Sequence, residues 1–321
     1  MAVTDLIKVQ VGQETTWGSQ VTATAKLMGV TDASVDIVDE VHQSTDMGAM
    51  YPSDVVAEVS QHAEGSITMD LSYEDILYPL DNMFEEETPT DASPLYTWTY
   101  VAPTTAVLVG NVYTLEFGAP DAEYEVTGAL FTGGTISGEA GGVWTGEFPF
   151  IGQDVDDNSM TALASHTVEL IRMADTVLTI DTWTGTMGAT PVSSELISFE
   201  LAFETGRHLK YFNGALAPGD YGCTKHTGTL TTVMEFGTVA KAIVDALTVP
   251  GLIQRQIRLK ATSSTHYAQI DFAGTLDAGG VTLFDDRDGN ITVSLPWVGT
   301  WNDTDTNWLE FTIANALSTL A

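Results

Sequence analysis

The sequence contains few basic residues, one cysteine and no long apolar run. Eleven Lys and Arg stand against 44 Asp and Glu, which gives a formal net charge of −33. Between Lys26 and Arg172 there is no Lys or Arg, while 26 acidic residues fall in that interval. Such a surface repels phosphate backbones, which argues against binding of nucleic acid. Two explanations remain open, adaptation to high salt and a surface past which a polyanion must slide.

The other absences exclude several protein classes. The single Cys223 cannot form an internal disulfide, and without a second cysteine a zinc cluster is not expected. No run of about 18 apolar residues is present to span a bilayer. Residues 1–12 lack the charged start and apolar middle of a signal peptide. We therefore expect a soluble protein with no membrane partner.

Two similar stretches organise the chain. Residues 124–152 and 268–299 both have the pattern of a Gly-rich β-hairpin that ends in Pro followed by an aromatic residue. Four positions recur at a constant shift of 146 residues (274 − 128), namely Gly128, Leu130, Gly133 and Gly134 against Gly274, Leu276, Gly279 and Gly280. Pro149 and Pro296 follow at a shift of 147 (296 − 149). The pattern indicates an internal duplication.

A helix is predicted before each hairpin. Residues 72–84 place apolar side chains on one face, and Ser72 with Asp75 resembles a capping box. Pro79 predicts that this helix is short or kinked. Residues 238–247 form the second helix. The two apolar stripes correspond at a shift of 163 (239 − 76), with Ile76, Leu80 and Phe84 matching Val239, Ile243 and Leu247.

The sequence therefore predicts a mainly β protein with two tandem homologous β-barrel or β-sandwich domains, each with one flanking α-helix. The first domain is expected at residues 1–155, the linker at 156–165 and the second domain at 166–321. The two shifts differ by 17 residues (163 − 146), which places an acidic insertion at about residues 85–100 of the first domain. We expect this insertion to decorate the outside. Each copy also contains an excursion predicted as a long loop, at residues 40–65 and 204–227.

Little in the sequence indicates catalysis. Asp285 and Asp288 resemble part of a calcium loop, but the first copy keeps the glycines of this turn and lacks the ligands, so a hairpin turn is the stronger interpretation. The six histidines show no zinc spacing, and none lies beside a nucleophile signature. The Gly pairs lack the strand-to-helix context and the Lys of a phosphate site. We expect no enzyme activity and no cofactor.

The two excursions differ in charge. The second contains Arg207, Lys210 and Lys225, whereas the first contains only acidic residues among its charged positions, at Glu40, Asp46, Asp54, Glu58 and Glu64. If copies of the chain stack, these segments could meet with opposite charge, which would fix register more than affinity. The alternative is that they are two unrelated solvated loops.

The segment Gly12-Gln13-Glu14-Thr15-Thr16-Trp17-Gly18 resembles the G-x-E-T-x-x-G start of the tail tube proteins of long-tailed, siphovirus-type bacteriophages. The order of strand, excursion, strand, helix, strands and hairpin is also similar. The resemblance implies a β-barrel with a flanking helix, whose sheets line a lumen when six domains close a ring. Because this chain has two copies, it implies the two-barrel variety, with three chains in a pseudo-hexameric ring.

The resemblance further implies a structural virion protein, assembled in the host cytoplasm, whose stacked rings form the tail tube for DNA ejection. Its partners would be other copies of itself and tail proteins such as the terminator, tape measure and baseplate, while DNA passes an acidic lumen without specific binding. The excursions would reach the neighbouring ring. Two alternatives remain open. One is a baseplate hub, terminator or decoration protein on the same barrel, and the other is a carbohydrate-binding β-protein with Trp98, Trp301 and Trp308 as platforms.

Overall fold

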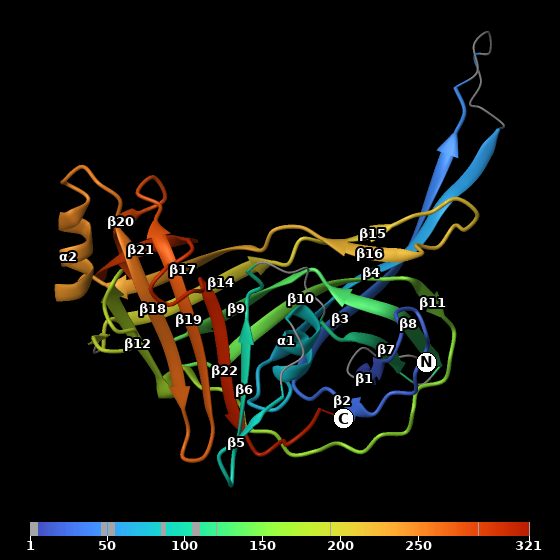
Figure 1. Cartoon of the computed structure of the whole chain (residues 1–321), viewed down its shortest axis with the longest axis horizontal. Coiled ribbons are helices and arrows are strands. Elements are labelled where there is room, and N and C mark those ends of the chain that lie inside the picture. Colours follow the sequence, from blue (N-terminus) through green and yellow to red (C-terminus); the bar gives the residue numbers. More distant parts are fainter. Residues whose placement is uncertain are drawn as a thin grey trace.

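The computed structural model describes residues 6–45, 50, 55–84, 88–104, 110–119, 121–192, 194–287 and 289–320. Within these ranges the chain is mainly β with two α-helices, as predicted. Figure 1 shows an elongated body with α2 at one end and a long hairpin projecting from the other. Neither helix of the described ranges is long and apolar enough to cross a membrane.

The chain divides into two halves of similar element order. The first half contains β1 (Lys8–Glu14), β2 (Ala25–Lys26), β3 (Val30–Gln43), β4 (Val56–Asp70), α1 (Leu77–Met83), β5 (Thr90–Asp91), β6 (Tyr96–Val101), β7 (Val112–Ala119), β8 (Ala122–Phe131), β9 (Gly133–Glu139), β10 (Trp144–Gly152) and β11 (Asp154–Asp156). The second half contains a 3-10 turn (Met173–Asp175), β12 (Thr176–Thr182), β13 (Pro191–Val192), β14 (Leu196–Glu204), β15 (Arg207–Lys210), β16 (Asp220–Cys223), β17 (Thr227–Glu235), α2 (Thr238–Ala246), β18 (Gln254–Thr262), β19 (Tyr267–Leu276), β20 (Thr282–Arg287), β21 (Asn290–Gly299) and β22 (Leu309–Asn315).

The halves pair their strands in the same antiparallel pattern. In the first half β1 pairs with β2 and β7, and β8 pairs with β7, β10 and β11. In the second half β12 pairs with β13 and β18, and β19 pairs with β18, β21 and β22. A second sheet runs β3–β4–β10–β9 in one half and β14–β17–β21–β20 in the other. Each half is therefore two packed sheets joined at a corner strand, β8 or β19.

The two four-stranded sheets join into one, which we call the wall. β9 pairs with β14 from Glu139 opposite Ser198 to Gly133 opposite Glu204. The wall therefore has eight strands in the order β3, β4, β10, β9, β14, β17, β21 and β20. No described strand pairs with the outer edge of β3 or of β20. An isolated chain thus exposes two sheet edges, which proteins rarely leave uncovered.

The insertion in the first half belongs to the sheet of the second half. Its strand β6 pairs with β22, with Trp98 opposite Ile313. The Trp98 indole is buried and donates to the Leu317 carbonyl at 3.2 Å. The alternating aromatic residues of β6 thus complete this sheet, while decoration of the outside of a tube by the insertion stays a prediction.

The core follows from alternation along the wall. In β10, Trp144, Phe148 and Phe150 point inward and are at most 2% exposed, while Glu147 between them is exposed. Each fully buried aromatic side chain of this kind stabilises the fold by about 1.5–3 kcal/mol relative to exposure. The largest fully buried side chains occur in both halves and belong to one continuous hydrophobic core.

α1 begins late and is short, as Pro79 predicts. The Ser72 hydroxyl accepts the N–H of Asp75 at 3.0 Å, which is the capping contact expected from the sequence, and the helix itself begins at Leu77. Pro79 falls in the first turn, where its missing N–H costs little. α2 follows Gly237, close to the predicted start.

Both excursions contain strands, so their prediction as loops was wrong. The first is the far end of β3 and β4, which we call the arm; Figure 1 shows it projecting beyond the body. The arm lacks a clear alternation because solvent lies on both of its faces. The second is the hairpin β15–β16, which folds back over the first half. Leu216 of its loop accepts the Gln61 N–H at 3.1 Å, and Tyr211 hydrogen-bonds His62 at 2.9 Å.

Candidate functional site

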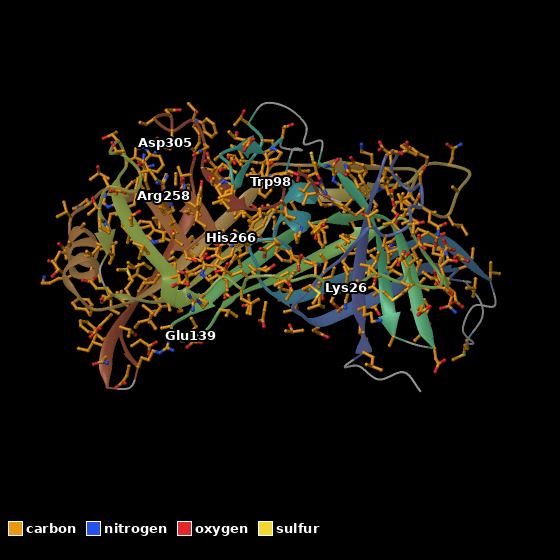
Figure 2. The ribbon with its side chains drawn as sticks, turned by 90° about the horizontal axis from the view of Figure 1, so that it is seen from below. Lys26, Trp98, Glu139, Arg258, His266 and Asp305 are labelled. Atoms are coloured by element: carbon orange, nitrogen blue, oxygen red, sulfur yellow. The ribbon has the colours of Figure 1, made fainter. Side chains whose placement is uncertain are left out.

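The outward face of the wall is strongly acidic. Its strands alternate, so residues between the core-facing ones point away from the interior. The carboxylates on this face include Asp32, Asp36, Glu64, Asp70, Glu139, Glu147, Glu200, Glu204 and Glu235. Figure 2 shows Glu139 on the opposite side of the molecule from Asp305, which belongs to the outer layer of the second half.

Small hydroxyl residues separate most of these charges. Glu147 lies between Thr68 and Thr135 on the neighbouring strands, and Glu200 lies between Ser137 and Thr231. Like charges directly opposite each other would destabilise the sheet, so this alternation lets the face hold many carboxylates. A hollow of about 550 Å³ on this face is lined by both kinds of side chain.

Basic residues are almost absent from this face. Among the described wall strands the exception is Arg287 at the end of β20, whose guanidinium donates to Glu139. The face therefore presents carboxylates and neutral hydroxyls to solvent, a combination that repels a polyanion and offers it no docking point.

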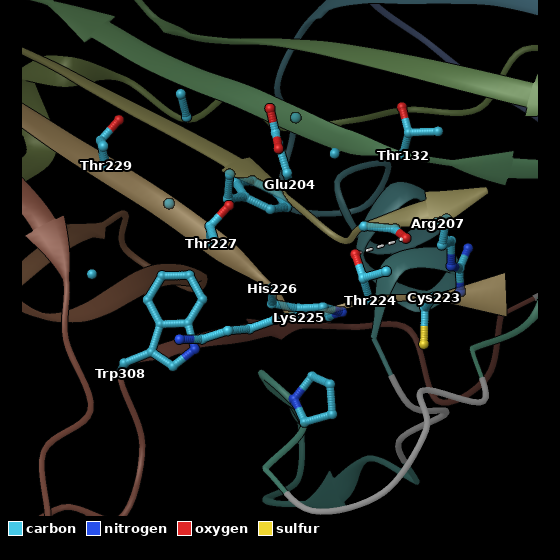
Figure 3. Close-up of a pocket in the computed structure, with 18 of the residues that line it drawn as sticks. Thr132, Glu204, Arg207, Cys223, Thr224, Lys225, His226, Thr227, Thr229 and Trp308 are labelled. Carbon is cyan, nitrogen blue, oxygen red and sulfur yellow. Dashed lines mark hydrogen bonds between the residues drawn. The ribbon is translucent and has the colours of Figure 1, made fainter.

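A larger hollow of about 1190 Å³ lies where the two halves meet, and Arg207 and Lys225 of the second excursion line it (Figure 3). Arg207 is 6% exposed; its Nη1 donates to Asn82 Oδ1 at 2.6 Å and its Nη2 to the Asn82 carbonyl. Burial lowers the pKa of Arg207 to about 10, so it stays charged at neutral pH. Burial, with the nearby Arg207 charge, lowers the pKa of His226 to about 4, so this imidazole is neutral.

The structure separates the basic residues predicted as contact candidates. Arg207 is occupied inside the chain by Asn82 of α1. Lys210 pairs across its own hairpin with Asp220 at 3.2 Å, an exposed pair that contributes little. Lys225 lines the hollow of Figure 3. These three residues therefore do not form one exposed basic loop.

The acidic contact candidates lie on or near the arm. Glu40 accepts the Ser60 hydroxyl at 2.9 Å, Glu64 pairs with His62 at 3.0 Å, and Glu58 is exposed. Asp46 and Asp54 lie outside the described residues. Contact of this segment with another copy stays a prediction.

The acidic turn of the second hairpin is a tight connection. Gly289 has φ of +84° and its N–H donates to Asp286 Oδ1 at 2.9 Å, while Asp285 Oδ1 accepts the Asp286 N–H at 3.0 Å. Asp288 lies outside the described residues. In the described part of the chain no three His, Cys, Asp or Glu side chains converge in a way that could hold a metal ion.

Two of the three tryptophans proposed as sugar platforms, Trp301 and Trp308, line the larger hollow. Trp98 is buried, and Trp308 packs against Phe272 with ring centroids 6.0 Å apart. Trp301 is 42% exposed and donates to Asp303 at 2.9 Å. A flat platform of adjacent exposed rings is therefore not formed by these three residues.

The sequence did not indicate two polar layers beneath the outer loops. In the first half Glu116 lies opposite Glu125, and Glu116 accepts the backbone N–H and the hydroxyl of Thr161 in the linker, both at 2.7 Å. In the second half Arg258 lies opposite Asp271 and donates to both of its oxygens, at 2.6 and 2.7 Å. Glu125 and Asp271 correspond at the 146-residue shift, so alignment of the copies could have located these pairs.

Comparison with known proteins identifies the family of the chain. The profile of the family described as phage tail tube protein matches residues 4–306, nearly the whole chain. A comparison with curated proteins finds no match. The matched family is structural, its members assemble with themselves into a tube and contact other tail proteins, and it places the protein in the virion tail. The chain therefore belongs to the phage tail tube protein family and is a structural component of the tail tube.

Proposed function

We propose that three copies of the chain close a ring, that rings stack into the tube, and that the acidic face of the wall lines a channel for DNA ejection. The observation that carries the proposal is the pairing of β9 with β14. In that pairing the edge of one half's sheet joins the edge of the other. The same pairing between β20 of one copy and β3 of the next would join copies as the halves are joined.

The number of chains follows from treating the halves as repeats. Each chain then fills two of six equivalent positions, as the resemblance to tube proteins with six single barrels per ring implies. The contact is head-to-tail, so it either closes or continues indefinitely, and closure would remove the exposed edges of β3 and β20.

Two glycines support the pairing. A Cβ at Gly133 would lie 2.3 Å from the Phe203 carbonyl, so the close approach of β9 and β14 requires glycine there. Gly279 matches Gly133 at the 146-residue shift of the sequence, although the hydrogen bonds of this corner follow a shift of 145 (277 − 132). Gly279 lies in the turn before β20, and the nearest atom to a Cβ there is Asp277 Oδ1 at 3.5 Å. The glycine is thus present at a position where the isolated chain has room for a side chain. A strand from another copy would use that room.

The acidic face supports the assignment of the lumen. DNA binding is driven largely by neutralisation of phosphates by Lys and Arg, which this face lacks apart from Arg287 paired with Glu139. Exiting DNA would therefore meet repulsion and neutral hydroxyls. The arm projects along the direction of β3 and β4 and is suited to reach an adjacent ring.

Matched glycine substitutions test the ring. Gly279→Val should leave the melting temperature of the unassembled chain unchanged, because the site is open, and should reduce the assembled fraction at least tenfold. Gly133→Val should instead destabilise the chain itself, because the Phe203 carbonyl blocks the side chain. Normal assembly of Gly279→Val would contradict the proposed edge contact.

Negative-stain electron microscopy of the purified wild type distinguishes the proposed tail tube from the two alternative functions. Long hollow tubes would support the proposed stacking of rings, whereas single rings that never stack would indicate a terminator or hub. A chain that does not assemble at any concentration but binds glycans through Trp301 would indicate the carbohydrate-binding alternative.

The lumen is tested by labelling assembled tubes with a maleimide coupled to a folded protein too large to enter. In a Cys223→Ser background, Glu147→Cys on the acidic face should be protected, and Val177→Cys, 49% exposed on the outward side of β12, should react. Equal reaction of both thiols would place the acidic face outside.

A further inference from the structure

α1 and α2 occupy corresponding places in the two halves but differ in how much of each helix is buried. Every residue of α1 is buried, from Leu77 to Met83. In α2 only Ala240 and Ile243 are buried. The strands around both helices pair in the same pattern, so α1 and α2 hold corresponding places in the two halves.

The second half provides the cover of α1. Phe84, at the end of α1, has its ring centroid 6.0 Å from that of Phe203 and 5.4 Å from that of Phe311. Beside it, Thr205 donates its backbone N–H and its hydroxyl to the Thr132 carbonyl, both at 2.9 Å. Thr205 is completely buried by this contact. The end of β14 and the residue after it thus cover the helix of the first half.

The second half has exposed apolar side chains on the segment after α2 and on the hairpin β20–β21. These residues, which we call the edge surface, are Val249 (65% exposed), Leu252 (81%), Phe284 (69%) and Ile291 (51%). Phe284 has φ of +61°, an unfavourable conformation for a bulky residue that natural proteins keep mainly for a purpose. Exposed apolar side chains of this size are typical of a contact surface.

The pairing registers identify the side chain that would seal the edge surface. Phe203 lies opposite Gly228 and Val35 lies opposite Gly65, glycines that correspond at the 163-residue shift. Val35 therefore holds the place of Phe203, and Ile37 holds the place of Thr205. Ile37 is 54% exposed, although the inward-facing residues before it on β3, Ala33 and Val35, pack on the core.

The target of Ile37 follows from the same correspondence. Thr132 donates its N–H to the Pro149 carbonyl at 2.9 Å, and Asp277 donates to the Pro296 carbonyl at 2.9 Å, so Asp277 holds the place of Thr132. Leu276 in turn donates to the Ile253 carbonyl at 2.8 Å, which brings Leu252 beside this point. A residue that holds the place of Thr205 would arrive at Asp277 and pack on Leu252.

We propose that the edge surface is the docking site for a second copy of this chain, with Ile37 on β3 of that copy packed against Leu252 and its backbone N–H bonded to the Asp277 carbonyl. This inference rests on the proposed ring and names the side chains that seal it. In the ring α2 is covered by the next chain as α1 is covered within its own.

The test uses two single-cysteine chains in a Cys223→Ser background. Ile37→Cys and Asp277→Cys proteins are mixed, assembled and treated with a short bismaleimide, and the expected product is a covalent dimer of one chain of each kind. Ile37→Cys mixed with Val177→Cys is the control and should give no such dimer. Each thiol is first titrated in the unassembled chain, since all three positions are exposed and should react.

The outcomes distinguish this inference from the ring itself. Assembled protein with the Ile37–Asp277 dimer supports both the ring and the assigned docking surface. Assembled protein without that dimer overturns the assigned surface and leaves the ring in place, whereas wild type that does not assemble overturns the ring as well. Leu252→Lys should lower the assembled fraction at least tenfold without changing the unassembled chain's melting temperature, and unchanged assembly would contradict the role of Leu252.

Discussion

The two halves of the wall have the same strand order, but only the first half has a strand paired with its last edge. The sheet edge of the first half at β9 is paired with β14, while the corresponding edge at β20 has no described partner. α1 is buried and α2 is mostly exposed. The fold therefore makes this edge contact once within the chain and leaves the corresponding edge unpaired. We propose that the internal contact is a template for a contact between chains.

The polar layers of the halves offer a second comparison. Glu125 and Asp271 correspond, but Glu125 faces Glu116 whereas Asp271 faces Arg258. In the second half Asp271 is paired with the Arg258 guanidinium, whereas in the first half Glu125 accepts the side-chain amides of Gln20 and Asn158, at 2.8 and 3.3 Å. The same backbone position can thus be satisfied by a charge pair or by neutral amide donors.

The largest effect is expected from breaking the internal cover of α1. Arg207→Glu places an unpaired negative charge against Asn82 in a buried site and should lower the free energy of unfolding by about 3–5 kcal/mol. Urea denaturation of the unassembled chain measures this. A loss below about 1 kcal/mol would mean that Arg207 does not hold the halves together.

The next effect sharpens the comparison of the polar layers. Asp271→Asn removes the charge that accepts both donors of Arg258 and should lower the free energy of unfolding by about 1.5–3 kcal/mol. Thermal or urea unfolding at neutral pH checks it. Wild-type stability of this variant would show that the pair is dispensable.

The corresponding change in the first half should have the opposite sign. Burial, and to a smaller extent Glu116, raises the pKa of Glu125 above its ordinary value. Because the folded-state pKa is the higher one, ionisation of Glu125 weakens the fold as pH rises through it, and Glu125→Gln should raise the melting temperature at pH 7. The gain should shrink as pH falls toward the ordinary carboxyl pKa, where wild-type Glu125 is protonated. A lower melting temperature at pH 7 would contradict this account.

The smallest effect is expected at Lys210. Its pair with Asp220 is exposed on both sides, so Lys210→Glu should change the free energy of unfolding by no more than about 1 kcal/mol. This variant is the matched control for Arg207→Glu, three residues away on β15. Equal losses for the two would remove the distinction between a buried and a solvated base.

Much of the fold could be predicted from local pattern. The alternation of residues 124–152, the apolar stripe ending at Phe84 and the repeated glycines locate strands, helices and the repetition of the halves. Gly289 in a hairpin turn also follows from its neighbours, because turn chemistry is local.

What could not be predicted is which strands pair over long distances. Nothing in β6 specifies that it pairs with β22, and nothing in β9 specifies β14, because alternation reports burial and not the partner. The strands of the arm could not be predicted because neither face is buried, so the sequence there shows no alternation of apolar and polar residues. Arg207 was predicted to be a solvated contact residue, and its burial depends on Asn82, 125 residues earlier in the chain.

The account's central claim is that β20 of one chain pairs with β3 of the next as β9 pairs with β14. A cryo-electron microscopy reconstruction of assembled tubes tests it directly. We predict rings of three chains in which β20 and β3 of neighbours are hydrogen-bonded, Ile37 lies at Asp277 and the acidic face points to the lumen. Rings of six chains, or a ring contact that leaves β3 and β20 unpaired, would contradict it.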